Sequence, residues 1–351
     1  MRGFVMLIID DNERQIVAFP LRIQYPGMVV LVSNRCFDQK MLMQPNDPQV
    51  SAIILGCLAR AVAIHRVEVI GYVFMGNHFH LILRVFFGNL GDFMRDFQSW
   101  LAIKLKAYRG LDTCVFPERY KPVDLLDDEK AFEKLIYTLL NPCAAHLVDH
   151  PEEYPGLSSL QHHLEGGKVR GRWVDQERYT RNKKRNPNYD IENAVTYHEF
   201  ELTPLPQMKD WTMERRRKTF MRALEKGAEK IRVERESAPV LGVEGIKALS
   251  FETRPKNPKF SKSSACVSFD REKIAEHWEH RRRVTDAYYK AKKKDHDPQY
   301  TGEVRYPPGT IPPGRSKSIP FSKRDLKNMR LPFILVAEER PPPARAAQAA
   351  A

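Results

Sequence analysis

The segment that decides the fold covers residues 67–85 and reads VEVIGYVFMGNHFHLILRV. Two apolar, β-branched runs lie on either side of Gly76-Asn77, an order of turn residues that a hairpin accepts. We therefore predict strands over 67–75 and 78–85. Successive side chains of a strand point to opposite faces, so His78 and His80 should share one face and Phe79 should point to the other.

The flanking sequence predicts a compact α+β unit over residues 1–160. Its further elements are expected as a strand over 28–33, helices over 50–65 and 90–109, a short strand within 116–126, and a helix over 127–148. The order β-α-β-β-α-(β)-α favours a small antiparallel sheet with helices on one face, similar to a split β-α-β layout.

Positive charge is concentrated in the second half of the chain. The 351 residues carry a formal net charge of +13, whereas residues 1–160 hold 16 Lys and Arg against 18 Asp and Glu. Residues 161–320 are predicted as a basic, largely helical DNA-binding or accessory region, with helices over 211–236 and 270–294 and a basic loop over 254–264. Residues 321–351 are predicted as a C-terminal segment that ends in a disordered Pro/Ala tail. The charge balance indicates a polyanionic partner.

Two protein classes are disfavoured by composition. No apolar run reaches the roughly 20 residues that span a bilayer, and the longest, over 50–64, is interrupted by Arg60. The five cysteines are widely spaced and form no CxxC pair, which argues against a disulfide framework and a structural zinc site. The sequence thus predicts a cytoplasmic protein with no membrane partner.

Four side chains suggest chemistry. His78 and His80 on one sheet face form half of a divalent-cation site, although two such histidines alone also fit a solvated surface. Tyr137 and Asn141 stand four residues apart on the predicted helix, so they share a face. A phenol can act as a nucleophile and an amide oxygen can bind a hard metal, whereas a core tyrosine and a helix-ending Asn-Pro are the plainer interpretations.

Taken together, these residues resemble the HUH single-tyrosine transposases, the family that includes the REP-associated tyrosine transposases. The similar stretches occur in one order within residues 23–160: Val32-Ser33-Asn34-Arg35, the run from Val73 to Leu81, the helix after it, Tyr137-Thr138-Leu139-Leu140-Asn141-Pro142-Cys143-Ala144-Ala145, and Tyr154-Pro155-Gly156-Leu157-Ser158-Ser159. The sequence departs from the family at Gly76, where Pro or Ser usually precedes Asn-His. The second half matches only larger members, and loosely.

The resemblance implies an HUH, ferredoxin-like catalytic domain and a role for each motif residue. His78, His80 and Asn141 would bind Mg²⁺ or Mn²⁺, and Tyr137 would be the nucleophile. The implied activity is metal-dependent cleavage of single-stranded DNA and strand transfer, through a 5′-phosphotyrosine intermediate, at hairpin or insertion-element ends. Single-stranded or hairpin DNA would be the partner. Whether the protein acts as a monomer or a homodimer stays open.

Other residues are weighed for nucleophilic and DNA-binding roles. The rival tyrosines are Tyr72, Tyr108 and Tyr120, for which core packing or a DNA-facing position are the alternatives. The candidate DNA contacts are Arg35, Arg119, Lys121, Arg170, Arg172, Trp173, Arg181, Lys183 and Lys184. In the second half these cations alternate with aromatic residues, a pattern that suits single-stranded DNA and also an ordinary solvated face.

Three other functions fit parts of the pattern. A domesticated relative could bind hairpin DNA without transposition activity. A relaxase-like replication initiator would share the HUH fold, but such proteins tend to have a third histidine where this chain has Asn141. A basic structural protein is the plainest alternative.

Overall fold

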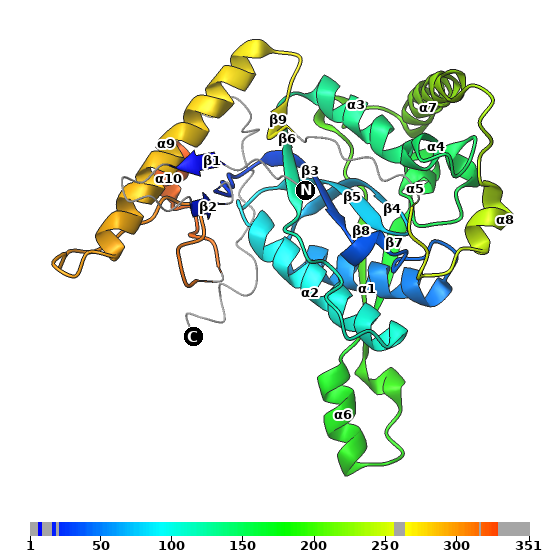
Figure 1. The fold of residues 1–351 in the computed structure, drawn as a ribbon, viewed down its shortest axis with the longest axis horizontal. Helices are drawn as coiled ribbons and strands as arrows, with labels where there is room; N and C mark the ends of the chain where they lie inside the picture. Colours follow the sequence, from blue (N-terminus) through cyan, green and yellow to red (C-terminus); the bar gives the residue numbers. More distant parts are fainter. Residues whose placement is uncertain (1–5, 9–15, 19–20, 256–263, 316, 329–351) are drawn as a thin grey trace.

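The computed structural model describes residues 6–8, 16–18, 21–255, 264–315 and 317–328. Its centre is a five-stranded sheet in the order β4-β5-β3-β6-β9 (Figure 1). The strands are β3 (Met28–Arg35), β4 (Glu68–Phe74), β5 (His78–Val85), β6 (Lys121–Leu125) and β9 (Cys266–Val267). All neighbours pair antiparallel except β6 and β9, so the sheet is mixed. The α+β class predicted from the sequence is confirmed.

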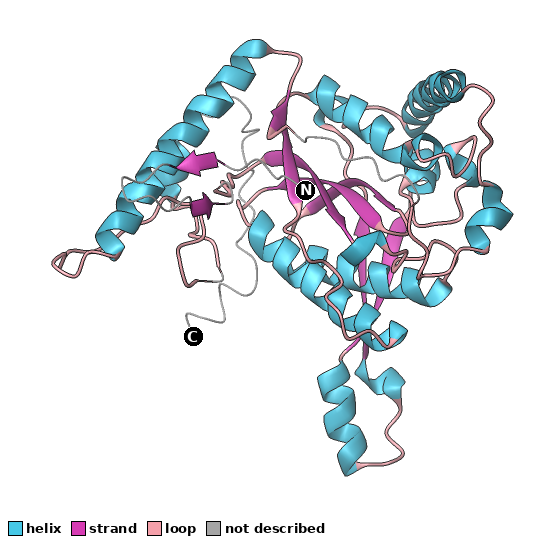
Figure 2. Cartoon of the chain, viewed as in Figure 1, coloured by secondary structure: helices cyan, strands magenta, loops and turns pink. Residues whose placement is uncertain are grey.

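Helices cover both faces of this sheet, not one face as the sequence suggested (Figure 2). One face packs against α1 (Pro48–His65) and α2 (Leu90–Arg109), and the other packs against α3 (Asp128–Leu139). The short α5 (Leu160–Glu165) and the long α7 (Met213–Arg235) extend the second layer. The reason is that β4 is buried and apolar on both sides, and Ile82 of β5 is buried on the α3 side, so each side of the sheet needs its own cover.

The α1 helix is buried between two layers. It is the one helix in the described ranges that is long and apolar enough to cross a membrane. Here its apolar residues pack against the central sheet on one side and, on the other, against the two-stranded sheet of β7 (Lys168–Val174) and β8 (Val195–Glu201). A Cβ on Gly56 would lie 2.2 Å from the carbonyl oxygen of Arg172, and one on Gly171 would lie 2.2 Å from that of Leu55. Glycine at both positions therefore permits the close approach of α1 and β7.

The helix predicted over 127–148 is interrupted. Helix α3 ends at Leu139, and a separate short turn, α4 (Asn141–Ala144), follows. Pro142 has no N–H to donate to the preceding turn. The side-chain nitrogen Nδ2 of Asn141 donates instead to the carbonyl oxygens of Tyr137 (3.0 Å) and Thr138 (3.3 Å). Asn141 therefore completes the end of α3.

The structure has two clusters of buried hydrophobic residues, one on each face of the central sheet. Both contain residues from before and after residue 160, where the sequence suggested a domain boundary. Phe220 and Leu224 of α7 pack in the same cluster as Leu135 of α3, and β9 extends the central sheet. The remaining elements are β1 (Met6–Ile8), β2 (Ile16–Ala18), α6 (Gln176–Arg185), α8 (Gly242–Lys247), α9 (Arg271–Asp295) and α10 (Lys323–Asn328). Most of the basic loop, 256–263, and the tail, 329–351, lie outside the described residues.

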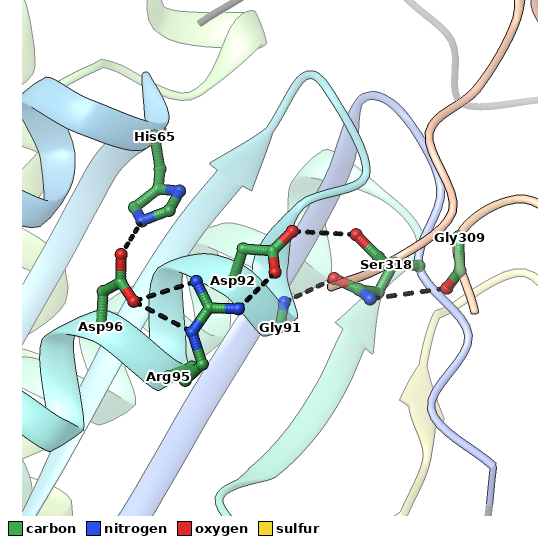
Figure 3. A network of polar contacts seen from close by, with 8 residues as sticks. His65, Gly91, Asp92, Arg95, Asp96, Gly309 and Ser318 are labelled. Carbon is green, nitrogen blue, oxygen red and sulfur yellow. Dashed lines mark hydrogen bonds and ion pairs between the residues drawn. The ribbon is translucent and has the colours of Figure 1, made fainter. Parts of the chain in front are cut away.

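A polar network fastens the C-terminal segment to the body (Figure 3). Ser318 donates to Asp92 at 3.0 Å, and Arg95 bridges Asp92 and Asp96 at 2.8 and 2.9 Å. The carboxylate of Asp96 lies 3.0 Å from Nε2 of His65, at the end of α1. Through these contacts the chain after residue 300 is joined to α2 and, by way of His65, to α1.

A buried imidazole predicts that the fold is sensitive to acid. The ring of His163 stacks on Phe220 with centroids 4.6 Å apart, and its Nε2 is buried with no hydrogen-bond partner in the described ranges. Burial lowers its pKa to about 3. In the unfolded chain the same group takes up a proton near pH 6.5, so stability present above that pH is lost as the pH falls toward 3. We expect His163→Phe to reduce the loss of unfolding free energy between pH 6.5 and 4.5 by about 2 kcal/mol, measured by urea denaturation. The exposed His296→Gln is the control, and an unchanged pH dependence in His163→Phe would contradict this account.

Candidate active site

The two histidines lie side by side at one end of the central sheet. Alternation along β5 places Phe79 in the core that faces α1 and α2, where it is 0% exposed. His78 and His80 point to the opposite face, with ring centroids 5.2 Å apart. The strand geometry predicted from the sequence is therefore observed.

Both imidazoles are neutral at pH 7. Burial lowers the pKa of His80 to about 4 and that of His78 well below its usual value, and the positive charge of Arg35 lowers both further. Nδ1 of His78 lies 2.6 Å from the amide oxygen of Asn77. Because that oxygen only accepts, Nδ1 carries the proton and Nε2 keeps a free lone pair. Nδ1 of His80 is buried and has no hydrogen-bond partner among the described residues.

Tyr137 faces this pair from α3. Its ring centroid lies 6.5 Å from that of His80, nearly perpendicular to it, and the residue is 49% exposed. Such exposure does not fit the interpretation of Tyr137 as a core residue. Lys134, one turn earlier, places its Nζ 5.2 Å from the centroid of the Tyr137 ring. The sequence reasoning missed Lys134, although its i, i+3 spacing from Tyr137 was visible.

The rival tyrosines occupy different environments. Tyr72 and Tyr120 are buried, and Arg22 covers the Tyr120 ring at 3.5 Å. Tyr108 is exposed on α2, where its hydroxyl donates to the carboxylate of Asp47 at 3.2 Å. Of the four tyrosines, Tyr137 is the one with a described ring contact to a histidine of the pair.

Positive charge surrounds the pair on the same face. Arg35 lies directly opposite His78 in the β3–β5 register. Ser33 of β3 pairs with His80 on one side and with Lys121 of β6 on the other. Directly opposed residues share a face, so Lys121 lies in the row of His80, two strands or roughly 10 Å away. Arg119 is exposed just before β6.

The predicted DNA contacts of the second half lie elsewhere. They belong to β7 and to α6, on the α1 side of the sheet, and so face away from the histidine pair. Arg170 pairs with Glu199 at 3.5 Å, and Arg172 pairs with Glu192. Trp173 is only 9% exposed, so its ring is not available to stack on a base.

The burial of Trp173 has a physical reason that its sequence neighbours do not reveal. Its ring packs 5.1 Å from the ring of Trp100, and the guanidinium of Arg60 lies 4.2 Å from its centroid. Arg181, Lys183 and Lys184 are exposed on α6. The predicted DNA-binding residues thus form two groups on opposite sides of the sheet.

The donor atoms fit part of a divalent-cation site. Among the described residues there is no group of three or more His, Cys, Asp or Glu side chains that could hold a metal. The pair offers two neutral imidazoles, one with a nitrogen that lacks any partner. The described hydrogen bonds of the Asn141 amide nitrogen are to its own helix, which leaves its amide oxygen as the ligand atom. Its ligand role stays a prediction.

No protein-family model matches the chain, and no curated protein matches it. Among solved structures, the chain is similar to a REP-associated tyrosine transposase described as bound to a REP hairpin. The similarity has a TM-score of 0.34 and 13% sequence identity, and it covers 50% of this chain and 88% of that chain.

Proposed function

We propose that this protein is a transposase that cleaves single-stranded DNA at hairpin or insertion-element ends and transfers the strand. The observation that carries the proposal is the half-exposed Tyr137 ring, which contacts one of two half-buried, neutral histidines. Arg35 and Lys121 add positive charge on the same sheet face. A nucleophile, ligand nitrogens and phosphate-binding cations are the groups that phosphoryl transfer to a side chain requires.

The proposed cleavage is a transesterification. The phenolic oxygen of Tyr137 bonds to phosphorus, the bond from phosphorus to the 3′ oxygen breaks, and the proton lost by the phenol is balanced by the one gained at that oxygen. The products are a 5′-phosphotyrosine and a free 3′ hydroxyl. Attack of another 3′ hydroxyl on the phosphotyrosine reverses the step, so strand transfer consumes no ATP.

The surrounding residues have separate proposed roles. Lys134, whose Nζ lies 5.2 Å from the centroid of the Tyr137 ring, would add positive charge beside the nucleophile. Arg35 and Lys121 hold the phosphates of the bound strand, and Arg119 would contact the same strand. His78 and His80, with the amide oxygen of Asn141, would hold Mg²⁺ or Mn²⁺, which when bound polarises the phosphate. We propose that the enzyme acts on DNA in the cytoplasm.

The proposal is tested by looking for a covalent protein–DNA adduct. Hairpin oligonucleotides with single-stranded flanks, labelled at the 3′ end, are mixed with the protein in Mn²⁺, in Mg²⁺ or in EDTA and run on denaturing gels. We expect label to stay with the protein in either metal and not in EDTA, because the 5′ phosphate of the 3′ fragment is joined to tyrosine. A 5′ label should instead mark a released fragment that a polymerase can extend.

The same assay distinguishes the second candidate, a domesticated hairpin-binding protein. Tight, specific binding of hairpins without an adduct, across a broad set of flanking sequences and both metals, would contradict the transposase proposal. It would favour the binding protein, which needs the cations of the site and not the nucleophile.

A further inference from the structure

Helix α6 projects from the body at the tip of the β7–β8 hairpin (Figure 1). None of its residues is buried. It is capped by Asp175, whose side chain accepts from the backbone N–H of Arg178 at 2.9 Å, and Nζ of Lys183 donates to the carbonyl oxygen of Tyr189 at 3.3 Å. A helix that is polar all round and contacts mainly the adjoining turn of its own hairpin, Ile191–Ala194, gains little from the fold that carries it.

The charge of α6 is not neutralised by the protein. Five of its ten residues are cations, Arg178, Arg181, Lys183, Lys184 and Arg185, and one residue, Glu177, is acidic. The ion pairs described for this hairpin involve the β7 cations Lys168, Arg170 and Arg172, and in the described part of the chain none involves an α6 cation. The exposed cations of α6 are therefore available to bind an anion from outside the protein.

The arrangement of these cations fits the backbone of double-stranded DNA. Arg178, Arg181 and Arg185 stand at i, i+3 and i+7, so they form one stripe about 10 Å long at 1.5 Å per residue. Guanidinium groups bind phosphates in a bidentate manner, and the major groove admits an α-helix. An anionic membrane fits less well, because α6 has no apolar face beyond Tyr179, whose ring lies 6.4 Å from that of Tyr189.

The position of α6 separates it from the histidine pair. The β7–β8 hairpin packs on α1, whereas Tyr137 and the histidines lie on the α3 side of the sheet. A short single-stranded DNA bound at the histidine pair would not contact α6. A DNA molecule would have to pass around the edge of the sheet to contact both the histidine pair and α6.

We propose that α6 is a second DNA-binding site, which holds a double-stranded stem or flank through its phosphates, independent of sequence. The single-stranded segment to be cleaved occupies the site at the histidine pair, and only this assignment rests on the proposed function. The arginine stripe of α6 then supplies affinity for duplex DNA, while cleavage depends on the residues at the α3 side of the central sheet.

The test compares two sets of three substitutions in the full chain. The first removes the α6 stripe (Arg178→Gln, Arg181→Gln, Arg185→Gln), and the second removes equal charge from exposed positions of α9 (Lys290→Gln, Lys292→Gln, Lys293→Gln). Binding of a 5′-fluorescein-labelled duplex of about 20 base pairs is followed by fluorescence anisotropy at several salt concentrations. Because no α6 residue is buried, both sets should leave the thermal unfolding midpoint unchanged.

We expect the α6 set to reduce the slope of log K against log salt by about 2.7, because each lost phosphate contact contributes about 0.9. Its duplex affinity at about 100 mM salt should fall more than tenfold, and the α9 set should lose much less. Equal losses in both sets, or no loss in the α6 set, would overturn the proposal. So would a loss confined to phosphatidylserine vesicles, which would assign α6 to membranes.

A separate measurement distinguishes this inference from the proposed function. Adduct formation on a short single-stranded oligonucleotide without a stem should be within about twofold of wild type in the α6 set, because its side chains lie away from Tyr137. Loss of the adduct on that substrate would overturn the assignment of α6 to duplex alone. A wild-type protein that forms no adduct would contradict the proposed function, while duplex binding still reports on α6.

Discussion

Tyr137→Phe should abolish the covalent protein–DNA adduct. The substitution removes only the phenolic oxygen, which is the atom that bonds to phosphorus in the proposed reaction. Loss of a nucleophile lowers the rate by at least about 1000-fold, so no labelled protein should be visible on denaturing gels. Hairpin affinity should stay within about twofold of wild type, since the ring remains in place. Because the side chain is half-exposed, the free energy of unfolding should change by less than about 0.5 kcal/mol.

Tyr108→Phe is the matched control. Tyr108 is also exposed, but its hydroxyl donates to the carboxylate of Asp47 and its described contacts do not include the histidine pair. This variant should form the adduct at the wild-type rate. An adduct that persists in Tyr137→Phe and disappears in Tyr108→Phe would transfer the role of nucleophile to Tyr108, and the geometry around His80 would then need another explanation.

The histidine hairpin shows what local sequence can predict. Alternation over residues 67–85 predicted both strands, the shared face of His78 and His80, and the position of Phe79 on the opposite face, where the structure buries it. These features depend on neighbours within a few residues, because strand geometry assigns each side chain to a face. The position of Tyr137 beside His80 came instead from the resemblance, since no local rule places α3 against this end of the sheet.

The second half shows where local reasoning fails. The start of the predicted basic region over 161–320 is rich in cations because the exposed faces of β7 and α6 carry the charges. Val169 and Trp173 alternate inward on β7. Trp173 is buried by residues more than 70 positions earlier, and the close approach of Gly56 and Gly171 joins equally distant elements. The two-residue strand β9 has no sequence signal of its own, because it forms by pairing with β6.

Replacing both histidines by alanine should remove divalent-cation binding as well as adduct formation. Their rings are neutral, so they can bind a cation without first losing a proton. We expect His78→Ala/His80→Ala to weaken Mn²⁺ binding by at least about 100-fold, beyond the range seen when only supporting residues are lost. Isothermal titration with Mn²⁺ in the absence of DNA measures this without any catalytic step. The exposed His296→Ala should bind Mn²⁺ as wild type does.

The histidine pair gives a cleaner test of the metal site than Asn141. Asn141 also has a structural role, because its side-chain nitrogen donates to the carbonyl oxygens of Tyr137 and Thr138 at the end of α3. Asn141→Ala would therefore displace the nucleophile's helix and remove a ligand at once, and lost activity would not separate the two effects. In the described part of the chain the two histidine side chains have no such structural role, since Nδ1 of His80 has no hydrogen-bond partner there and Nδ1 of His78 bonds to the side chain of its neighbour Asn77. Unchanged Mn²⁺ binding in the double variant would place the cation elsewhere and contradict the proposed metal site.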